Sequence, residues 1–493
     1  MTPSDRPEES SDRAYYIQCF RGTEARCRHA AFGVSSPAST KNKIQPLNSS
    51  SNDPAAWPSP RRGWYVTIVL LIGFTFSFID RQVLNLLVEP IRADLGISDT
   101  EISFLQGFAF VLTYVAMSVP IGRLVDRFNR VAIMVGGVLV WSIATVGCGL
   151  SRTYVQLMVA RLGVGAGEAA LSPAAWSMLA DYFRPERLAR PVSVYLMGPY
   201  LGAGIAMIAG AEVLDWTRQV DQLTLPLIGE VAPWQFTFIA VGLPGILIAA
   251  LIGTVREPVR RGTSGAVPVV PSWGEVLAHV RAHKRIYIAL HLGIPFVVVM
   301  LYGLQAWTPT VLVRVYGWDL AQAGRVYGVI ALLAGSGGVL TGPFVARFLE
   351  RRGRHGAPIL VPMAGAAMAA LCLIALPFQG SANLALACVA GASFGVTLPL
   401  ALITSSMQLV TPNEMRGVVN GMYVVTNNVL GLALGPTLVA ASTDFIFQDP
   451  TAVAKSLGLV SLVVGPIAVG TLSVGLRPYV RRIRQMEATA AAG

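Results

Sequence analysis

Four charged residues inside long apolar segments are the residues of this sequence most able to do chemistry. Asp80 and Arg81 are neighbours in one such segment, and Arg161 and Glu168 are seven residues apart in another. A charge at the centre of a lipid bilayer costs on the order of 3 kcal/mol, so such residues face the protein interior or water. Two acids and two bases held in this way can form ion pairs, carry a proton or bind a charged substrate.

The spacing predicts that one cation lies between two carboxylates. At about 1.5 Å per helical residue, Asp80 and Arg161 come to similar depths, and Glu168 follows Arg161 by two turns on nearly the same face. Arg161 keeps its charge at every relevant pH, whereas an unpaired carboxylate in a desolvated site favours its protonated form. We therefore predict that Asp80 and Glu168 carry the coupling proton and that Arg161 changes partner between them.

Simpler interpretations of these charges stay open. They could form a fixed ion pair that joins two helices and takes no part in chemistry. Arg81 lies about 100° around its helix from Asp80. It could therefore pair with a neighbouring helix, reach toward the membrane surface or contact a substrate.

Other kinds of chemistry find little support in the sequence. The five cysteines form no CxxC motif and no Cys/His cluster, so we expect no metal site. Residues 163–167 are rich in glycine, but they lie in an apolar segment and lack the lysine of a nucleotide-binding loop. We expect neither an enzyme nor a bound cofactor.

The composition shows what kind of protein must position these residues. Of 493 residues, 53% are hydrophobic and 13% are charged, about half the charged share of an ordinary soluble domain. So few charges cannot cover the surface of a soluble protein of this size. The formal net charge of +11 therefore does not indicate a nucleic-acid partner, and we expect a membrane protein surrounded by the lipid bilayer.

Apolar segments separated by short charged loops follow one another from Trp64 onward. A membrane-spanning helix needs about 20 apolar residues, and a helix satisfies its own backbone in lipid. The sequence predicts an all-α membrane protein with twelve transmembrane helices, at 64–88, 102–122, 131–150, 154–180, 191–213, 234–255, 285–313, 322–347, 357–377, 382–410, 415–441 and 452–476.

The loops divide the chain into two bundles of six helices. We predict a polar, disordered cytoplasmic tail at 1–63, a first bundle at 64–255, a basic cytoplasmic linker at 256–284, a second bundle at 285–476 and a cytoplasmic tail at 477–493. Thirty Lys and Arg residues fall on the side of the two termini, and at most six fall on the other. This asymmetry predicts that both termini are cytoplasmic in the cell inner (plasma) membrane.

Two cytoplasmic loops suggest an internal repeat. The loop after the second segment reads GRLVDRFNR from Gly122 to Arg130, and the loop after the eighth reads GPFVARFLERR from Gly342 to Arg352. Each places a glycine at a helix end and then basic residues in a tight turn. This pattern is typical of two parallel six-helix repeats.

The first of these loops resembles the signature loop of the major facilitator superfamily. The matching residues are Gly122, Leu124, Asp126, Arg127 and Arg130. The resemblance covers about 64–476. It implies two six-helix bundles, with pseudo-symmetry between them, that rock around a central cavity lined mainly by helices 1, 4, 7 and 10.

The resemblance also implies a cytoplasmic gate. In the family, the carboxylate at Asp126 faces the N-terminus of helix 11, where the helix dipole favours an anion. Arg127 and Arg130 would complete a cluster with Asp181 at the end of helix 4. The family usually has glycine where this chain has Asn129, and asparagine is tolerated in such a turn. We expect this cluster to hold the cytoplasmic side closed.

A narrower resemblance concerns the segments that carry the four buried charges. FIDR at 78–81, RLGVGAGEA at 161–169 and DYF at 181–183 are similar to the spinster-like branch. Its members include exporters of lysolipids and sphingolipid phosphates. The resemblance implies an amphiphilic or lipid-like substrate.

Further candidates lie on helix 5 and in the second half. Gly198, Pro199 and Gly202 resemble the family's exporter-type motif and predict either a lateral opening toward helix 8 or ordinary tight packing. The second half carries no acid or base deep in a segment, so the predicted substrate cavity combines one cation with uncharged polar and aromatic residues: Arg81, Tyr302, Gln305, Trp307, Thr397 and Asn427.

The sequence thus predicts a monomeric, proton-coupled secondary transporter of an amphiphilic or lipid-like molecule that works by alternating access in the lipid bilayer. One alternative with the same fold is a transporter of small organic anions or drugs. A membrane-bound sensor without transport activity is a third interpretation.

Overall fold

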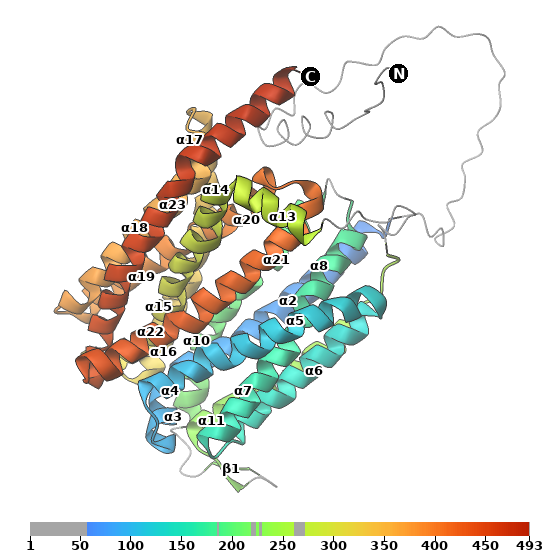
Figure 1. Cartoon of the computed structure of the whole chain (residues 1–493). Coiled ribbons are helices and arrows are strands. Elements are labelled where there is room, and N and C mark those ends of the chain that lie inside the picture. The colour runs from blue at the N-terminus through green and yellow to red at the C-terminus, as the bar shows by residue number, and fades with distance from the viewer. Residues whose placement is uncertain (1–56, 185–186, 218–222, 226–228, 261–271, 493) are drawn as a thin grey trace.

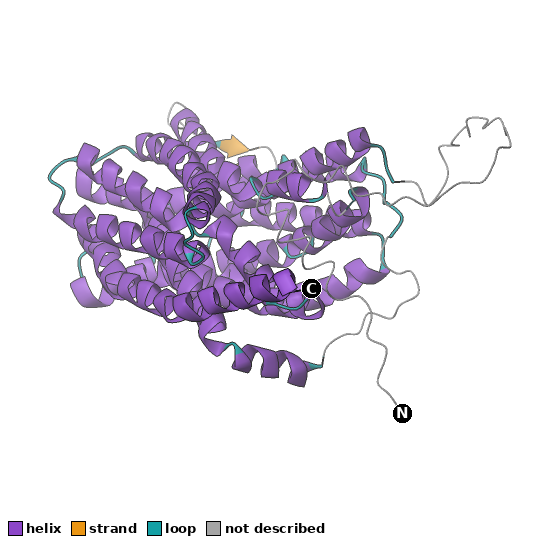
Figure 2. Ribbon diagram, turned by 90° about the horizontal axis from the view of Figure 1, so that it is seen from above, coloured by secondary structure: helices purple, strands orange, loops and turns teal. Residues whose placement is uncertain are grey.

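A computed structural model describes residues 57–492 except for four short internal segments, 185–186, 218–222, 226–228 and 261–271. Most of the tail predicted at 1–63 therefore lies outside the described residues. The described part is nearly all helical, as Figure 2 shows. In the labels used here, η marks a short π- or 3₁₀-helical segment.

The first half of the chain folds into helices wherever the sequence is apolar, and one small hairpin interrupts them. Its elements are α2 (Pro60–Leu86), α3 (Val88–Leu95), α4 (Asp99–Ser103), η1 (Phe104–Phe108), α5 (Ala109–Arg127), α6 (Arg130–Gly149), α7 (Tyr154–Glu168), α8 (Leu171–Tyr182), α9 (Ala189–Tyr195), α10 (Gly198–Thr217), the antiparallel strands β1 (Thr224–Leu225) and β2 (Gly229–Glu230), α11 (Pro233–Gly242) and α12 (Gly245–Gly253).

The second half repeats this pattern after a short linker helix. Its elements are α13 (Trp273–Ala282), α14 (Lys284–Ile288), η3 (Ala289–Gly293), α15 (Ile294–Tyr316), α16 (Leu320–Ile330), η4 (Ala331–Gly335), α17 (Ser336–Arg351), α18 (Ala357–Ala375), η5 (Leu376–Phe378), α19 (Ala382–Thr397), α20 (Leu400–Val410), η6 (Asn413–Met415), α21 (Arg416–Thr426), η7 (Asn427–Ala433), α22 (Leu434–Ala441), η8 (Ser442–Phe447), η9 (Pro450–Ala452) and α23 (Val453–Ala492).

These elements give twelve long helical passes in the described residues, as predicted. Eleven of them are long and apolar enough to cross a membrane without interruption. The remaining pass is the fourth, where α7 ends at Glu168 and α8 begins at Leu171. Two boundaries differ from the prediction. The linker contains the helix α13, and α23 continues as a helix into the segment predicted as a C-terminal tail.

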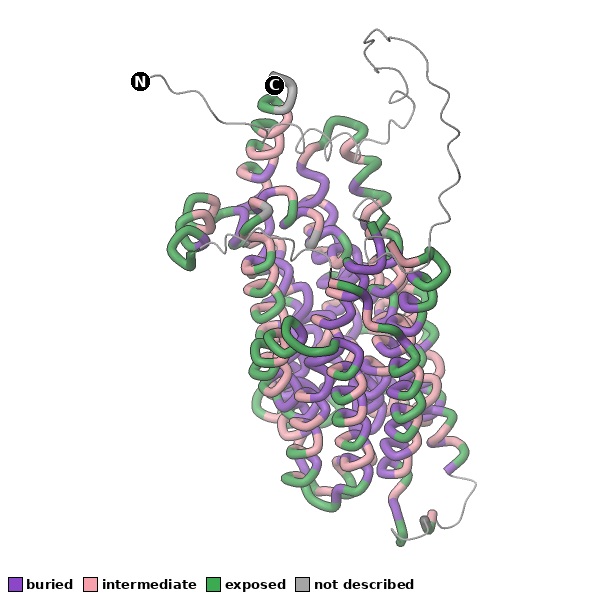
Figure 3. Tube along the Cα trace, turned by 90° about the vertical axis from the view of Figure 1, so that its right-hand side faces the viewer, coloured by how far each residue is buried: buried purple, intermediate pink, exposed green. Residues whose placement is uncertain are grey.

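The two halves lie side by side (Figure 1). We call the end where α2 begins and α23 ends the terminus side, and the opposite end, where α3 and β1 lie, the far side. Buried residues fill the interior of each half, and exposed residues cover its outside (Figure 3). Much of that outside is apolar, as at Ile143, Leu247 and Phe344, which is expected for a surface that faces lipid.

Small residues bring the fourth pass close to its neighbours. A Cβ atom on Gly165 would lie 2.5 Å from the Phe110 carbonyl oxygen, and one on Gly167 would lie 2.5 Å from the Trp141 nitrogen. Backbones can approach so closely only where side chains are absent. The glycines that lower helix propensity in this segment are therefore the residues that let α7 pack against α5 and α6.

This packing predicts that Gly167→Ala destabilises the protein, by about 1–3 kcal/mol, because the backbones of α6 and α7 must separate to admit the methyl group. Thermal unfolding of the purified protein in detergent measures the effect. Gly136→Ala is the matched control, since a Cβ atom at Gly136 on α6 meets no atom within 4 Å. Equal melting temperatures for the two variants would contradict the close contact.

Candidate functional site

The four charged residues predicted to do chemistry are all buried. Relative exposures are 1% for Asp80, 8% for Arg81, 0% for Arg161 and 3% for Glu168. Asp80 and Arg81 lie on α2, and Arg161 and Glu168 lie on α7. The structure therefore brings together, inside the first half, the residues that the sequence analysis grouped.

The pairing within this group differs from the prediction. Arg81 Nη2 donates a hydrogen bond to Glu168 Oε2 at 2.5 Å and forms the buried ion pair of the site. Arg161 instead donates to two main-chain carbonyls, that of Leu105 at 3.2 Å and that of Asp80 at 3.3 Å. The predicted pairing of Arg161 with Asp80 and Glu168 is therefore wrong in this structure, because neither carboxylate forms an ion pair with Arg161 among the described residues. The interpretation that Arg81 pairs with a neighbouring helix is the one that the geometry supports.

Several polar atoms of the group keep unused hydrogen-bonding capacity. The Asp80 carboxylate accepts one hydrogen bond, from the Thr145 hydroxyl to Oδ2 at 3.3 Å. Asp80 Oδ1, Glu168 Oε1 and Arg161 Nη2 have no partner among the described residues. Buried polar atoms are usually satisfied, and unsatisfied ones mark places where a proton, a water molecule or a ligand can be accommodated.

Aromatic rings surround the Arg81 guanidinium. Its Cζ atom lies 3.9 Å from the ring centre of Phe110, 4.5 Å from that of Phe78 and 6.0 Å from that of Tyr114. Such contacts stabilise a cation through the ring quadrupole, by roughly 2 kcal/mol when water is excluded. Arg81 is thus held in place by one carboxylate and by three rings.

Polar residues next to Arg81 connect the two halves. Gln82 Nε2 on α2 donates to Gln305 Oε1 on α15 at 2.8 Å, and Asn85 donates to Gln82 at 2.5 Å. A cavity beside them, lined in part by Arg81 and Gln106, has room of about 10 Å³ for the centre of a water molecule. That is close to the minimum for one water. Gln82, Asn85 and Gln106 were not predicted, because in the first half only the charged residues inside apolar segments were considered.

The predicted substrate residues of the second half separate into two groups. Tyr302 lines the same cavity as Arg81, and Gln305 bonds to Gln82. Trp307 is fully buried and donates to the Pro436 carbonyl at 3.0 Å. The predicted cavity position of Trp307 is therefore wrong, because its ring fills the core of the second half.

Two other predicted substrate residues lie elsewhere. The Thr397 hydroxyl bonds to the Ser393 carbonyl of its own helix at 2.9 Å and is buried. Asn427 accepts from the Tyr423 hydroxyl at 3.4 Å, at the start of the segment η7. Thr397 does not line the cavity next to Arg81, and neither does Asn427.

The predicted cytoplasmic gate is assembled only within the first half. Arg130 bonds to Asp181 at 2.5 Å, as expected, and also to Glu257 at 2.6 Å. Asp126 and Arg127 are exposed, and a Cβ atom on Gly122 would meet no atom within 4 Å. The expected contact of Asp126 with the start of helix 11 is not formed among the described residues.

Linker residues complete this cluster. Arg260 donates to the main-chain carbonyls of Val125 at 2.8 Å and Phe128 at 2.6 Å, and also bonds to that of Asp126. The contacts of Glu257 and Arg260 were not predicted, because the linker reads in the sequence only as a basic loop. Their contacts fasten the linker to the first half.

The far side carries the ion pairs that join the halves. Arg314 on α15 binds Asp99 with two hydrogen bonds, of 2.6 and 2.8 Å, and Glu89 with one of 2.7 Å. Arg92 also pairs with Asp99 at 2.9 Å. The Arg314 ion pairs between the halves lie on the far side, and the Gln82–Gln305 hydrogen bond between them lies at mid-depth. The structure is thus closed at the far side.

More exposed contacts add to this closure. The Asp444 carboxylate accepts from the Thr100 amide at 2.7 Å and the Thr100 hydroxyl at 2.6 Å. Arg325 pairs with Asp215 at 3.1 Å and with Glu212 at 3.3 Å. These contacts join α4 to η8 and α10 to α16.

The glycines predicted on helix 5 pack against helix 1 rather than helix 8. A Cβ atom on Gly202 would lie 2.5 Å from the Thr75 carbonyl oxygen of α2, and one on Gly198 would meet the Phe74 ring at 3.0 Å. Pro199 follows Gly198 in the first turn of α10. The close contact with the eighth pass comes instead from Gly204, whose Cβ atom would lie 2.9 Å from the Gly328 oxygen.

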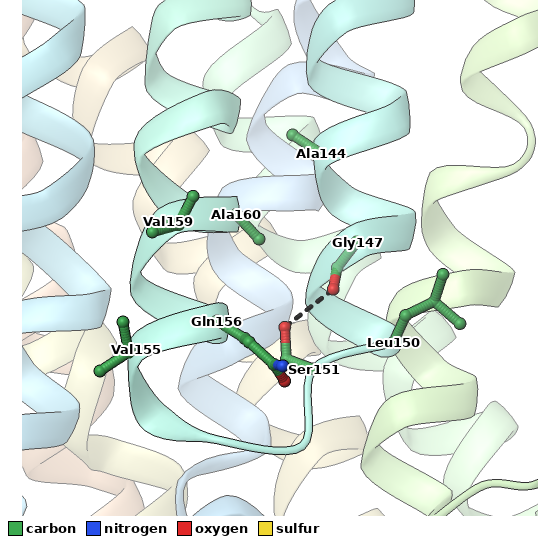
Figure 4. A pocket seen from close by; sticks show the side chains of 8 residues that line it. All are labelled: Ala144, Gly147, Leu150, Ser151, Val155, Gln156, Val159 and Ala160. Carbon is green, nitrogen blue, oxygen red and sulfur yellow. Dashed lines mark hydrogen bonds between the residues drawn. The ribbon is translucent and has the colours of Figure 1, made fainter.

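A larger hollow lies away from these charges. It is a groove of about 430 Å³ between α6 and α7, lined by small and apolar residues that include Ala144, Val155 and Val159 (Figure 4). Val155 and Val159 are exposed, and none of the four charged residues lines this groove. It is a feature of the apolar outer surface, and we assign the candidate site to the charged group instead.

The far-side contacts predict that Arg314→Gln opens that side. Arg314→Gln removes the cation that Asp99 and Glu89 share across the halves and leaves Asp99 with Arg92 alone. The cost is therefore below the roughly 3–5 kcal/mol of a buried ion pair that loses its only partner. Spin labels at Arg152→Cys and Phe378→Cys, in a background without native cysteines, report the far-side distance by pulsed electron resonance. Arg325→Gln is the control, because exposed pairs contribute about 0–1 kcal/mol. An unchanged distance in Arg314→Gln would contradict the role of this ion pair.

Comparisons with known proteins agree with this architecture. The family model described as Major Facilitator Superfamily matches residues 70–436. A relative, an MFS-type efflux pump of Mycolicibacterium smegmatis, is 27% identical over 418 residues, 84% of this chain and 92% of the relative. The sphingosine-1-phosphate transporter SPNS2 of Xenopus tropicalis is 24% identical over 455 residues, 88% of this chain and 84% of the relative.

A solved structure has the same fold. The crystal structure of a bacterial homolog to the human lysosomal transporter spinster, inward-facing and unoccupied, matches with a TM-score of 0.68 at 24% identity, over 88% of this chain and 99% of that chain. The family model covers most of the chain, and the relatives are transporters rather than enzymes. The chain therefore belongs to the Major Facilitator Superfamily, as a multi-pass membrane transporter with spinster proteins among its relatives.

Proposed function

We propose that this protein is a proton-coupled secondary transporter of an amphiphilic, lipid-like molecule and that it works by alternating access. The observation that carries the proposal is the buried Arg81–Glu168 ion pair next to the unsatisfied carboxylate oxygen of Asp80. Two carboxylates in one desolvated site, with one cation paired to one of them, are a suitable carrier for a proton. No metal or other cofactor enters the proposal.

Protonation of Glu168 would release Arg81. The neutral acid no longer holds the guanidinium by charge, and Arg81 then keeps its three aromatic contacts. Arg81 also lies next to the Gln82–Gln305 hydrogen bond between the halves. A movement of Arg81 would therefore change both the charged group and the contact that joins the two halves. We therefore assign the switch to Arg81 and a positioning role to Arg161, which ties α7 to the main chain of α2 and η1.

The position of the contacts between the halves supports alternating access. The ion pairs of Arg314 close the far side, while Asp126 and Arg127 are exposed on the terminus side. We place the terminus side in the cytoplasm of the cell on the excess of Lys and Arg there, so that the structure corresponds to an inward-open state. Closing the cytoplasmic side would bring Asp126 to the start of α21.

The substrate class is supported by the chemistry around Arg81. A cation enclosed by aromatic rings suits an anionic group attached to an apolar body, whereas Tyr302 and Gln305 offer uncharged contacts from the second half. One relative is a sphingosine-1-phosphate transporter. The similarity to an efflux pump favours a second candidate, a transporter of small organic anions or drugs. We expect the transporter to act as a monomer.

If Glu168 carries the coupling proton, Glu168→Gln abolishes transport driven by a pH gradient but leaves exchange of substrate across the membrane. The reason is that the amide cannot take up or release a proton. Flux into proteoliposomes with an imposed gradient measures both activities. Glu212→Gln is the control, since Glu212 lies on the exposed far side. Gradient-driven uptake by Glu168→Gln at the parental rate would refute proton transfer at this residue.

An amphiphilic, lipid-like substrate predicts that lysolipids and sphingolipid phosphates raise the melting temperature of the purified protein more than short-chain organic anions do. Arg81→Gln should remove this stabilisation, because the anionic group loses its cation, whereas Arg325→Gln should keep it. A larger stabilisation by organic anions than by the lipid-like compounds would favour the second candidate function.

A further inference from the structure

The linker helix α13 lies at the terminus side, near α14 (Figure 1). Its start is well defined. The Ser272 hydroxyl accepts a hydrogen bond from the Glu275 amide at 3.3 Å, and the Glu275 carboxylate accepts from the Ser272 amide at 2.8 Å. This reciprocal capping satisfies two orphan donors of the first turn. The linker therefore contains a helix with a defined start.

One face of α13 is seated on the second half. Val276 is buried, and His279 Nε2 lies 3.0 Å from the Tyr287 hydroxyl, which in turn lies 2.9 Å from the Thr411 hydroxyl. These contacts connect α13 through α14 to the end of α20. The orientation of α13 is therefore fixed.

An adjacent face of α13 is apolar, basic and exposed. Trp273 is 74% exposed and Leu277 is 44% exposed, and Arg281 follows with the same spacing of four residues, which places the three on one side of the helix. Arg281, Lys284 and Arg285 are exposed, and none of them forms an ion pair with a described residue.

The depth of α13 follows from the pass that it precedes. The seventh pass, Lys284–Tyr316, has 33 residues and is therefore about 50 Å long. A bilayer is about 30 Å thick in its hydrocarbon core and about 40–45 Å with its headgroups. The Lys284 end thus reaches the headgroup layer, and α13 is held at that level because only His283 separates it from α14.

The basic residues near the exposed face favour an anionic partner. Between Ser272 and Arg285 there are three Lys and Arg residues and one acid, Glu275, and the carboxylate of Glu275 is engaged in the helix cap. Tryptophan favours the membrane interface, and helices with an apolar strip and basic neighbours lie in that plane. We propose that the exposed face of α13 docks onto anionic phospholipid headgroups of the membrane that surrounds the transporter.

Docking would anchor the linker at the point where it enters the second half. Because α13 is bonded to Tyr287 and through it to Thr411, lipid contact at Trp273 would hold the terminus-side end of the second half relative to the membrane. At its other end, the linker is bonded to the first half through Arg260. The proposal does not depend on the identity of the transported molecule.

Hydrogen exchange of the full-length protein tests this proposal, in bilayers of phosphatidylcholine alone and in bilayers that also contain phosphatidylglycerol. Each basic side chain near an anionic surface strengthens binding about fivefold. We therefore expect the amides of α13 to exchange at least about tenfold more slowly in the anionic bilayer. The triple variant Arg281→Gln, Lys284→Gln and Arg285→Gln should lose most of this difference. Trp273→Ser with Leu277→Ser should speed exchange in both bilayers.

A second triple variant controls for loss of positive charge. Arg351→Gln, Arg352→Gln and Arg354→Gln remove three exposed charges at the end of α17, also on the terminus side. This variant should keep the difference between the two bilayers, and all variants should keep the parental melting temperature because the substituted side chains are exposed. Equal exchange of α13 in the two bilayers, or equal loss of the difference in both triple variants, would overturn the proposal.

Discussion

The high free energy of a charge in an apolar medium is the constraint on which this structure depends. Asp80, Arg81, Arg161 and Glu168 are all buried among apolar helices, so each needs compensation from the protein itself. Arg81 and Glu168 compensate one another, aromatic rings add to the stabilisation of Arg81, and main-chain carbonyls serve Arg161. Only Asp80 is left with a single weak hydrogen bond. The passes that carry these residues must therefore meet in one arrangement, with small residues where α7 crosses α5 and α6.

The same constraint acts between the halves. On the far side, Arg314 is largely buried against Asp99 and Glu89, so its charge is satisfied only while the two halves touch there. On the terminus side, Arg130 pairs with Asp181 of the first half and with Glu257 of the linker. The Arg314 ion pairs form only when the halves meet on the far side. The Arg130 ion pairs do not involve the second half, so they do not oppose separation of the halves on the terminus side. Under the proposed alternating access, this difference keeps the far side closed in the state in which the terminus side opens.

Most of the fold followed from the sequence, because apolar runs of about 20 residues have few alternatives in lipid. The twelve passes, the division into two halves and the membership of the superfamily were predicted correctly. The break after Glu168 was not, although Pro173 lacks the amide that would bond to the Ala169 carbonyl and continue the helix there. The four charges were found because a charge inside an apolar segment is conspicuous. Gln82, Asn85 and Gln106 were overlooked because uncharged polar residues give a weaker signal in such segments.

What the sequence determined by itself was therefore the set of charged residues, their approximate depth and their separation from the loops. Depth follows from residue number at a fixed rise per residue. The tertiary structure decided which residues pair, because pairing depends on the rotation of each helix about its axis. A turn of about 100° separates Asp80 from Arg81, and it is Arg81 that meets Glu168. The far-side pairs of Arg314 were likewise beyond the sequence, because their partners are more than 200 positions away along the chain.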